Sequence, residues 1–182
     1  MTASDIVPGR SCANCTLCCK VLSIPALLKP RGIVCGQCDW GKGCRIYARR
    51  PGACADFDCS YLLSPALGEE WKPTTAHLVL GYMTDADVIL VFTDPDHPSA
   101  WRKEPYFSRI KKWAASTENG YVLVRETTRA LALLGAEEFD LGAVRADQVV
   151  VRSKHPDSGA NTIFVVDKAV ADRVRSGRQG GT

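Results

Sequence analysis

The distribution of cysteine constrains this chain more than any other feature. The sequence has 182 residues and nine cysteines, all of which lie between Cys12 and Cys59. Such crowding occurs where thiols form disulfides, bind metal ions or hold an iron–sulfur cluster. The nine are Cys12, Cys15, Cys18, Cys19, Cys35, Cys38, Cys44, Cys54 and Cys59. Which of the three chemistries applies is therefore the main functional question.

The rest of the sequence favours metal over disulfides. No stretch approaches the roughly 20 apolar residues that span a bilayer, and residues 1–10 lack the apolar centre of a secretory signal. We therefore expect a cytoplasmic protein without a membrane partner, in a reducing compartment that disfavours structural disulfides. An odd number of cysteines would also leave one thiol outside any complete disulfide scheme. Metal ions are the expected partners.

Composition divides the chain into four parts. We expect residues 1–11 to be a flexible lead-in, 12–60 a cysteine-cluster metal-binding module, 61–172 an α+β body and 173–182 a disordered tail. The module is rich in Gly, Pro and Cys and has little periodicity, so it would not bury enough apolar area to fold unaided. Bound metal would supply the missing stability.

The body has the pattern of a small antiparallel sheet with one packed helix. Apolar and β-branched residues at 75–83 and 87–92 flank a polar break, as in a β-hairpin. A helix is expected from Ser99 to about Ser116, ended by Asn119-Gly120. Further strand pairs are expected at 121–125 with 129–134 and at 148–153 with 162–167. The predicted fold class is therefore α+β, an irregular Cys-rich metal-bound module joined to this sheet and helix.

Two Cys-x-x-Cys pairs in the module fit a zinc site. Cys12 with Cys15 and Cys35 with Cys38 have the spacing of tetrahedral zinc ligands. Two residues between ligands let the chain fold back, so that both sulfurs face one ion. Gly36 suits the tight turn that this requires. The pairs strongly indicate a metal site, but they are less specific about whether the metal is zinc.

The first three cysteines also fit an iron–sulfur cluster. Cys12, Cys15 and Cys18 have the Cys-x-x-Cys-x-x-Cys spacing that places three sulfurs on a cubane in bacterial ferredoxins, although the ferredoxin pattern does not continue with an adjacent cysteine. Side chains of the neighbouring Cys18 and Cys19 diverge in most backbone conformations, so we expect them to serve two separate or bridged metals. The fourth cluster ligand could be Cys19, Cys44, Cys54 or Cys59. Zinc and an iron–sulfur cluster both remain open.

The ligand set is expected to be all sulfur. The three histidines, His77, His97 and His155, lie outside the module. Thiolate coordination selects zinc or iron–sulfur over magnesium, calcium or manganese. A closed thiolate shell indicates a structural centre, because a catalytic metal keeps an open position.

Basic residues surround these thiols. Residues 1–60 contain eight Lys or Arg and four acidic residues, whereas the whole chain has a net charge of +3. Nearby cations would lower the pKa of the thiols and stabilise thiolate, although an ordinary solvated basic face would have the same composition. The weak net charge argues against a nucleic-acid partner. The body could offer a surface to a protein partner.

A second group of polar residues lies in the body. Asp94, Asp96 and His97 could bind a hard metal or act as acid and base. Because prolines flank them, we interpret the segment as a turn. His77 lies in an expected apolar strand, and we interpret it as a partly buried histidine without a ligand role.

The cysteines and their neighbours together resemble a known family. The string Cys12-Ala13-Asn14-Cys15-Thr16-Leu17-Cys18-Cys19 is followed by GCRIYARRPGAC at 43–54 and by FDC at 57–59. Over residues 12–60 the chain resembles the YkgJ-type cysteine-cluster family, a domain described as chelating zinc or iron. The resemblance implies a ligand set of Cys12, Cys15, Cys18, Cys19, Cys44, Cys54 and Cys59, with Cys35 or Cys38 as a further member.

Two functions follow as hypotheses. The first is a metal-binding protein that coordinates zinc or an iron–sulfur cluster through an all-cysteine module. The alternative is an iron–sulfur-dependent modifying enzyme resembling protein lysine N-methylases, which would imply S-adenosylmethionine. The sequence has no Gly-rich nucleotide loop after a strand and no Ser-His-Asp constellation, so it leaves open whether the chain is an enzyme.

Overall fold

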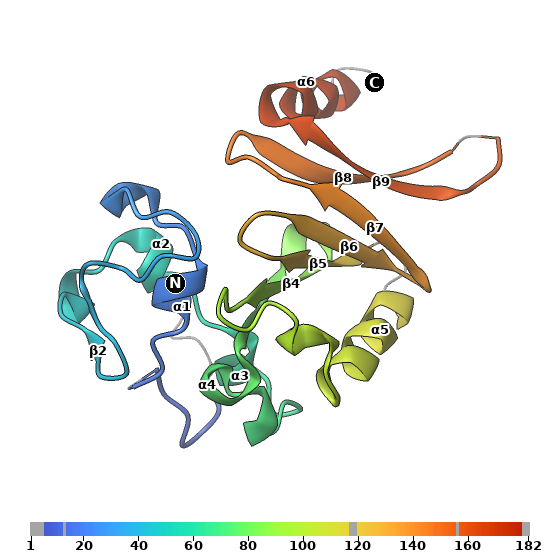
Figure 1. Cartoon of the computed structure of the whole chain (residues 1–182). Helices are drawn as coiled ribbons and strands as arrows, with labels where there is room; N and C mark the ends of the chain where they lie inside the picture. Colours follow the sequence, from blue (N-terminus) through green and yellow to red (C-terminus); the bar gives the residue numbers. More distant parts are fainter. Residues whose placement is uncertain (1–5, 13, 117–119, 156, 180–182) are drawn as a thin grey trace.

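The computed structural model of the chain has an α+β fold and describes residues 6–12, 14–116, 120–155 and 157–179. A five-stranded sheet lies at the centre of the molecule. The cysteine module packs beside it, and a C-terminal hairpin with a helix covers another part of the sheet (Figure 1). The predicted fold class is confirmed.

The central sheet has the strand order β3-β4-β5-β6-β7. Three of its neighbouring pairs are antiparallel, whereas β4 and β5 run parallel. Parallel neighbours need a crossover, and α5 supplies it by carrying the chain back between the two strands. The sheet is therefore mixed, not wholly antiparallel as the sequence suggested. The strands are β3 (Leu78–Met83), β4 (Val88–Thr93), β5 (Tyr121–Arg125), β6 (Ala130–Leu134) and β7 (Glu137–Gly142).

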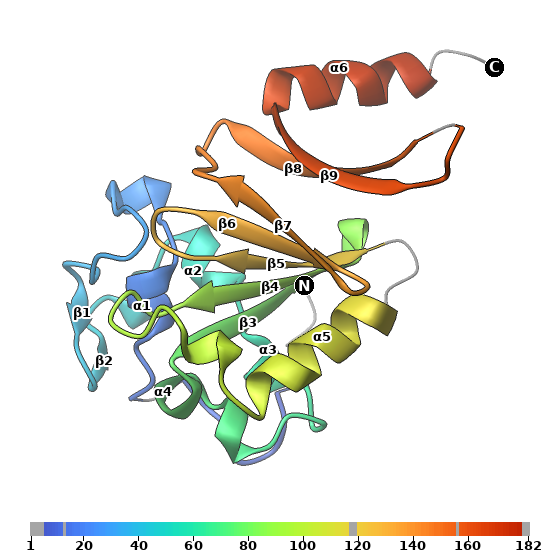
Figure 2. The same ribbon diagram turned by 45° about the vertical axis from the view of Figure 1, so that its right-hand side comes forward.

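One face of this sheet packs against α5 (Tyr106–Ser116), which lies across it in Figure 2. Alternate strand residues point to this face, as the pleat of a strand requires. Val122, Val124 and Leu133 share a buried cluster with Trp101 and Ile110. The short helices near this face or at its strand ends are α3 (Ser60–Leu63), η3 (Glu69–Trp71), α4 (Pro73–Ala76), η4 (Thr84–Ala86) and η5 (Ala100–Arg102), where η denotes a 3-10 helix.

The cysteine module covers part of the opposite face. Leu17 and Val21 form a buried cluster with Val79 of β3 and Phe92 of β4. The module's own elements are short, and none exceeds four residues. They are α1 (Cys18–Val21), η1 (Pro25–Leu27), β1 (Cys38–Asp39), β2 (Gly43–Cys44), η2 (Tyr47–Arg49) and α2 (Gly52–Ala55). The expected irregularity of this segment is confirmed.

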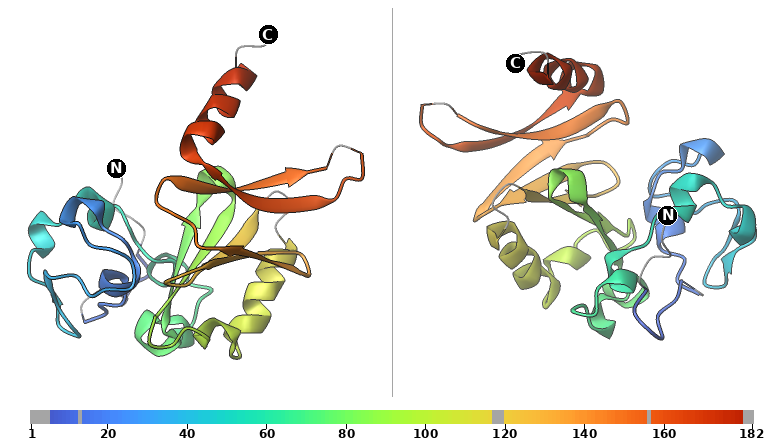
Figure 3. Two further views of the ribbon diagram at one scale, coloured as in Figure 1. Left: turned by 45° about the horizontal axis from the view of Figure 1, so that its top comes forward. Right: turned by 180° about the vertical axis from the view of Figure 1, so that it is seen from behind.

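A C-terminal hairpin covers a further part of that face. It consists of β8 (Gln148–Lys154) and β9 (Asn161–Asp167), and it is followed by α6 (Lys168–Gln179), which Figure 3 shows on the far side of the hairpin from the sheet. Ile163 of β9 shares a buried cluster with Tyr121 and Leu123 of β5. Because both sheet faces are covered, the apolar run of β4 is nearly continuous.

Several boundaries differ from the expected ones. The long helix begins at Tyr106, after Pro105, whereas Ser99 precedes the short η5. Strand β7 and helix α6 were not predicted, and α6 includes residues that we expected to belong to a disordered tail. Asn119 lies outside the described residues.

The lead-in segment is anchored to the body from residue 7 onward. The Val7 amide donates to the Leu62 carbonyl at 2.9 Å. The Arg10 guanidinium donates to the carbonyls of Tyr61, Ser64 and Leu67. It also lies over the Tyr61 ring, 4.3 Å from its centroid. This part of the expected flexible lead-in is therefore held against α3.

Lys20 links the module to the sheet through a buried ion pair. Its Nζ lies 2.5 Å from Asp94 Oδ1 and 2.6 Å from Asp96 Oδ2. Lys20 and Asp94 are 7% and 5% exposed. Burial lowers the pKa of Lys20, but the hydrogen bonds and charges of the two carboxylates outweigh it and raise the pKa. The ammonium is thus held charged at the junction between α1 and the end of β4.

We predict that Lys20→Met lowers the free energy of unfolding by about 3–5 kcal/mol, because the change leaves the Asp94 carboxylate buried without its partner. Urea unfolding followed by circular dichroism measures the loss. Lys42→Met removes an exposed lysine of the same module and should change stability little. Equal stability of the two variants would contradict the importance of the ion pair.

Candidate metal centre

Most of the cysteines face one cavity inside the module. The cavity has an empty volume of about 860 Å³, including its opening to solvent. Apolar side chains such as Leu22, Ile24 and Phe57 form part of its wall. All nine cysteines are free thiols. Those that line the cavity are Cys12, Cys15, Cys18, Cys19, Cys35, Cys44 and Cys54.

Backbone turns place these thiols. The Cys15 amide donates to the Cys12 carbonyl at 2.7 Å, and the Cys38 amide donates to the Cys35 carbonyl at 2.9 Å. Each Cys-x-x-Cys pair therefore closes the tight turn that its spacing predicts. The Cys35 amide also donates to the Cys19 carbonyl at 3.0 Å, which joins the second turn to α1.

The short β1–β2 ribbon brings a further cysteine to this region. Cys38 of β1 lies opposite Cys44 of β2 in the antiparallel pair. The Arg45 amide donates to the Gln37 carbonyl at 2.9 Å and extends the ribbon beyond its two-residue strands. Cys38 and Cys44, which are separate in sequence, thus lie side by side next to the cavity.

Interactions between the thiols divide most of them into two groups. Cys19 and Cys15 connect the groups, because Cys19 raises the pKa of Cys15 in addition to the larger effect of burial. The first thiol group consists of Cys12, Cys15 and Cys59: Cys15 and Cys59 raise the pKa of Cys12, and Cys15 raises that of Cys59. In the second, Cys19 hydrogen-bonds with the thiols of Cys18 and Cys38, and Cys19, Cys35 and Cys44 raise the pKa of Cys54. The second thiol group is therefore Cys18, Cys19, Cys35, Cys38, Cys44 and Cys54.

This grouping accounts for the two cysteines that do not line the cavity. Cys59 belongs with Cys12 and Cys15, and Cys38 lies beside Cys19. The structure therefore gathers all nine predicted ligands in one region. The thiols of Cys18 and Cys19 lie close to each other, whereas their adjacency in the sequence predicted diverging side chains.

Burial keeps several of these thiols protonated. Burial, followed by the neighbouring Cys59 and Cys15, raises the pKa of Cys12 to about 11. Burial and the neighbouring Cys19 likewise raise the pKa of Cys38 to about 11. Nearby cations act in the expected direction, since Arg50 lowers the pKa of Cys12, but burial outweighs them. The expected lowering by a nearby cation is therefore present at Cys12 but is smaller than the effect of burial.

The donor set fits a soft metal centre, although the sulfurs are not at coordination distance. Among the described residues, no three thiol sulfurs lie within 4.8 Å of one another. Tetrahedral zinc with bonds of about 2.3 Å would hold its sulfurs about 3.8 Å apart. Coordination would therefore draw the thiols together, which the short elements of the module can accommodate. Thiolate donors are those that zinc and iron–sulfur clusters prefer.

Thr16 supports the second thiol group and was not identified from the sequence. It is 3% exposed, its hydroxyl hydrogen-bonds with the Cys38 thiol, and the Gly41 amide donates to its Oγ1 at 3.1 Å. Groups that orient ligands in this way tune a metal site. Its place between Cys15 and Cys18 was the only signal in the sequence.

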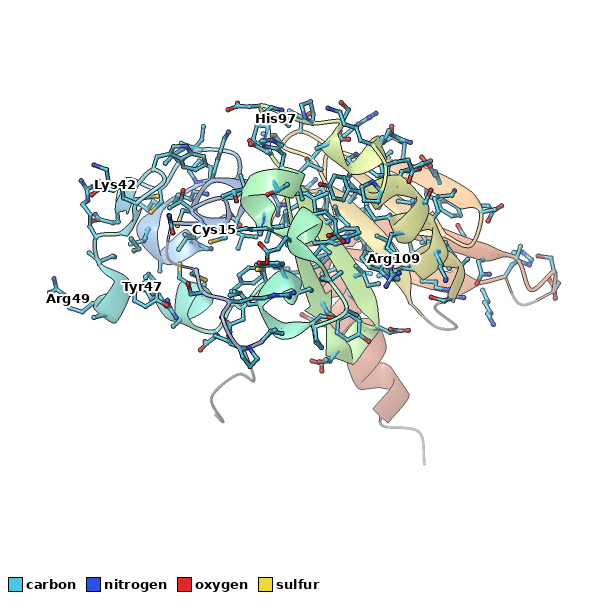
Figure 4. The ribbon with its side chains drawn as sticks, turned by 90° about the horizontal axis from the view of Figure 1, so that it is seen from below. Cys15, Lys42, Tyr47, Arg49, His97 and Arg109 are labelled. Atoms are coloured by element: carbon cyan, nitrogen blue, oxygen red, sulfur yellow. The ribbon has the colours of Figure 1, made fainter. Side chains whose placement is uncertain are left out.

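The second polar group lies outside the cavity. The Asp94–His97 segment is a turn as predicted, since the His97 amide donates to the Asp94 carbonyl at 2.9 Å. His77 is not inside a strand but follows α4, with a φ of 54°. Its imidazole stacks on that of His97, with 3.8 Å between ring centroids. Figure 4 shows Cys15 and Tyr47 in the module and His97 apart from them.

Comparisons with family models, curated proteins and solved structures gave no match for this chain. In the part of the chain that the structure describes, the helices are all too short or too polar to span a bilayer.

We predict that zinc affinity of the module rises with pH. With pKa values of about 11, Cys12 and Cys38 are protonated near neutral pH and must release a proton to bind metal. Lower pH favours the protonated thiols. For each proton that binding releases, zinc affinity should therefore fall about tenfold per unit decrease in pH. Competition with a chromophoric chelator from about pH 6.5 to about pH 8.5 measures this. An affinity independent of pH would contradict the prediction.

Proposed function

We propose that this chain is a metal-binding protein whose cysteine module coordinates zinc or an iron–sulfur cluster through thiolates. The observation that carries the proposal is the convergence of seven free thiols on one cavity, with the other two beside it. We further propose that the module is of the YkgJ-type, on the motif quoted above, and that the protein is cytoplasmic, where free thiols persist.

The architecture of the module supports a bound metal. One-turn helices and two-residue strands have little stability of their own. The module's buried apolar residues, such as Leu17 and Val21, are used in packing against the sheet. Residues 35–54 lie beyond that contact and include only one buried hydrophobic residue among those described, Cys35. Metal–thiolate bonds would hold this part together.

The two thiol groups suggest two centres. The second thiol group has six members, enough for a four-coordinate ion with further or bridging ligands. The first thiol group has three members and needs a fourth ligand. Cys18 and Asp58 both line the same cavity as Cys12, and Asp58 is close enough to raise the pKa of Cys12. The body then serves as the scaffold on which the module is mounted.

The direct test is metal analysis of protein purified without oxygen. We expect stoichiometric zinc in a colourless protein, or iron and sulfide in a brown protein that absorbs broadly in the visible range. Cys15→Ser should lose part of this metal, because Cys15 belongs to the first thiol group. Ser23→Ala changes a cavity-lining residue that is not a thiol and should keep the full content. Native protein without metal would overturn the proposal.

Removal of the metal should unfold the module and spare the sheet. We expect exhaustive chelation to increase amide hydrogen exchange in residues 12–59, while β5 and β6 stay protected within the buried core. Hydrogen exchange with mass spectrometry separates the two regions. Restoring zinc or reconstituting the cluster should restore protection. Unchanged exchange in the module after complete metal loss would show that sulfur coordination does not organise it.

A further inference from the structure

Two histidines and an aspartate meet at the junction between the module and the sheet. One ligand atom from each of His77, Asp94 and His97 lies within 4.8 Å of the other two. None of these three residues belongs to either thiol group. Asp94 is buried, His77 is half-buried and His97 is exposed, so the group is open to solvent on one side.

The two oxygens of the Asp94 carboxylate have different neighbours, and hydrogen bonds to one of them hold the group in place. Oδ1 accepts hydrogen bonds from Lys20 Nζ at 2.5 Å and from the Asp96 amide at 3.2 Å. Oδ2 lies 3.8 Å from His77 Nδ1. Metal-binding carboxylates are commonly held in this way, with one oxygen hydrogen-bonded by a second residue.

The backbone holds the two histidines in place. The Asp94 amide donates to the His77 carbonyl at 2.9 Å, one step beyond the β3–β4 ladder that ends at Leu78 and Thr93. The left-handed conformation of His77, with φ at 54°, ends α4 and sets the direction of its side chain. The turn from Asp94 then brings His97 against His77, with their ring centroids 3.8 Å apart.

The separation of His77 and Asp94 fits a shared ion better than a direct contact. A hydrogen bond would bring Nδ1 and Oδ2 to about 2.7–3.2 Å, and the observed 3.8 Å exceeds this range. A tetrahedral zinc ion with bonds of about 2.1 Å would place its nitrogen and oxygen ligands about 3.4 Å apart. His77 and Asp94 therefore need to approach only slightly to share one ion, and the ligand atom of His97 lies within 4.8 Å of both.

Charge around the group also favours a cation. Lys20 contributes one positive charge, and Asp94 and Asp96 contribute two negative charges. With neutral imidazoles the group carries a net negative charge. The ammonium faces Oδ1, whereas Oδ2 points toward the histidines.

We propose that His77, Asp94 and His97 form a further metal site, for a divalent transition-metal ion such as Zn²⁺, that is separate from the cysteine module. Imidazole and carboxylate donors suit zinc and related divalent ions. Three protein ligands with one exposed member leave a position for water or an exchangeable ligand, unlike a closed thiolate shell. The site goes beyond the proposed function because it uses none of the cysteines.

The three histidines of the chain allow a direct test. Protein labelled with ¹⁵N-histidine gives separate imidazole signals for His77, His97 and His155. Zn²⁺ is added stepwise to the purified protein, whose own metal content has been measured. We expect the His77 and His97 signals to shift together and to saturate with one added ion per chain, while His155 stays unchanged.

Variants then assign the site. His97→Ala should weaken binding of the added Zn²⁺ at least about tenfold and remove the response of His77. His155→Ala is the matched control, since His155 is exposed in the loop between β8 and β9, and it should bind as the wild type does. His77→Asn keeps a residue that tolerates the left-handed conformation and should also weaken binding.

Several outcomes would overturn the site. These are similar shifts of all three histidines, saturation of the protein with Zn²⁺ beyond the capacity of its thiols without any shift of His77 and His97, or unchanged affinity of these signals in His97→Ala. The result is independent of the cysteine module. If the thiols held no metal, analysis of the purified protein would show it, and the imidazole signals would still report on this site.

Discussion

The buried ion pair between Lys20 and Asp94 is the contact on which both candidate sites depend. Lys20 directly follows Cys18 and Cys19 in α1, so its position fixes these thiols relative to the sheet. On the other side, the ammonium occupies Oδ1 of Asp94 and leaves Oδ2 toward His77. A buried charge is tolerated only when it is paired, so the module can dock on the sheet in few ways. The pair thus specifies geometry more than it adds stability.

Local signals in the sequence predicted the elements of the fold better than their pairing. Runs of apolar and β-branched residues predicted the β3–β4, β5–β6 and β8–β9 hairpins, because adjacent strands joined by short turns need no distant information. The parallel pairing of β4 with β5 depends on how α5, which connects the two strands, packs against the sheet, and no local pattern records this. Strand β7 begins with the exposed Glu137 and Glu138 at the edge of the sheet, so its apolar signal is weak.

The sequence identified the thiols of the candidate centre but not how they are grouped. Cysteine spacing identified the thiols, whereas the proximity of Cys59 to Cys12 depends on how the ends of the module meet. The basic surplus predicted lower thiol pKa values, and burial, which depends on packing, reversed this for Cys12. His77 and His97 were assigned to unrelated roles. They meet because the ladder that pairs Leu78 with Thr93 continues to His77 and Asp94, so the register of one hairpin was the missing information.

The two ligand sets would differ in the metals that they prefer and in how readily a bound metal exchanges its ligands. Thiolates bind zinc or iron–sulfur tightly in a shell without open positions, whereas two imidazoles and a carboxylate leave room for water. The shared neighbour of both sets is Lys20, and a cation at Asp94 Oδ2 would face its ammonium across one carboxylate. Asp96 offsets this repulsion, because its carboxylate binds the same ammonium at 2.6 Å and lies on the exposed side. The second carboxylate is therefore what allows a buried lysine and a metal ion to share Asp94.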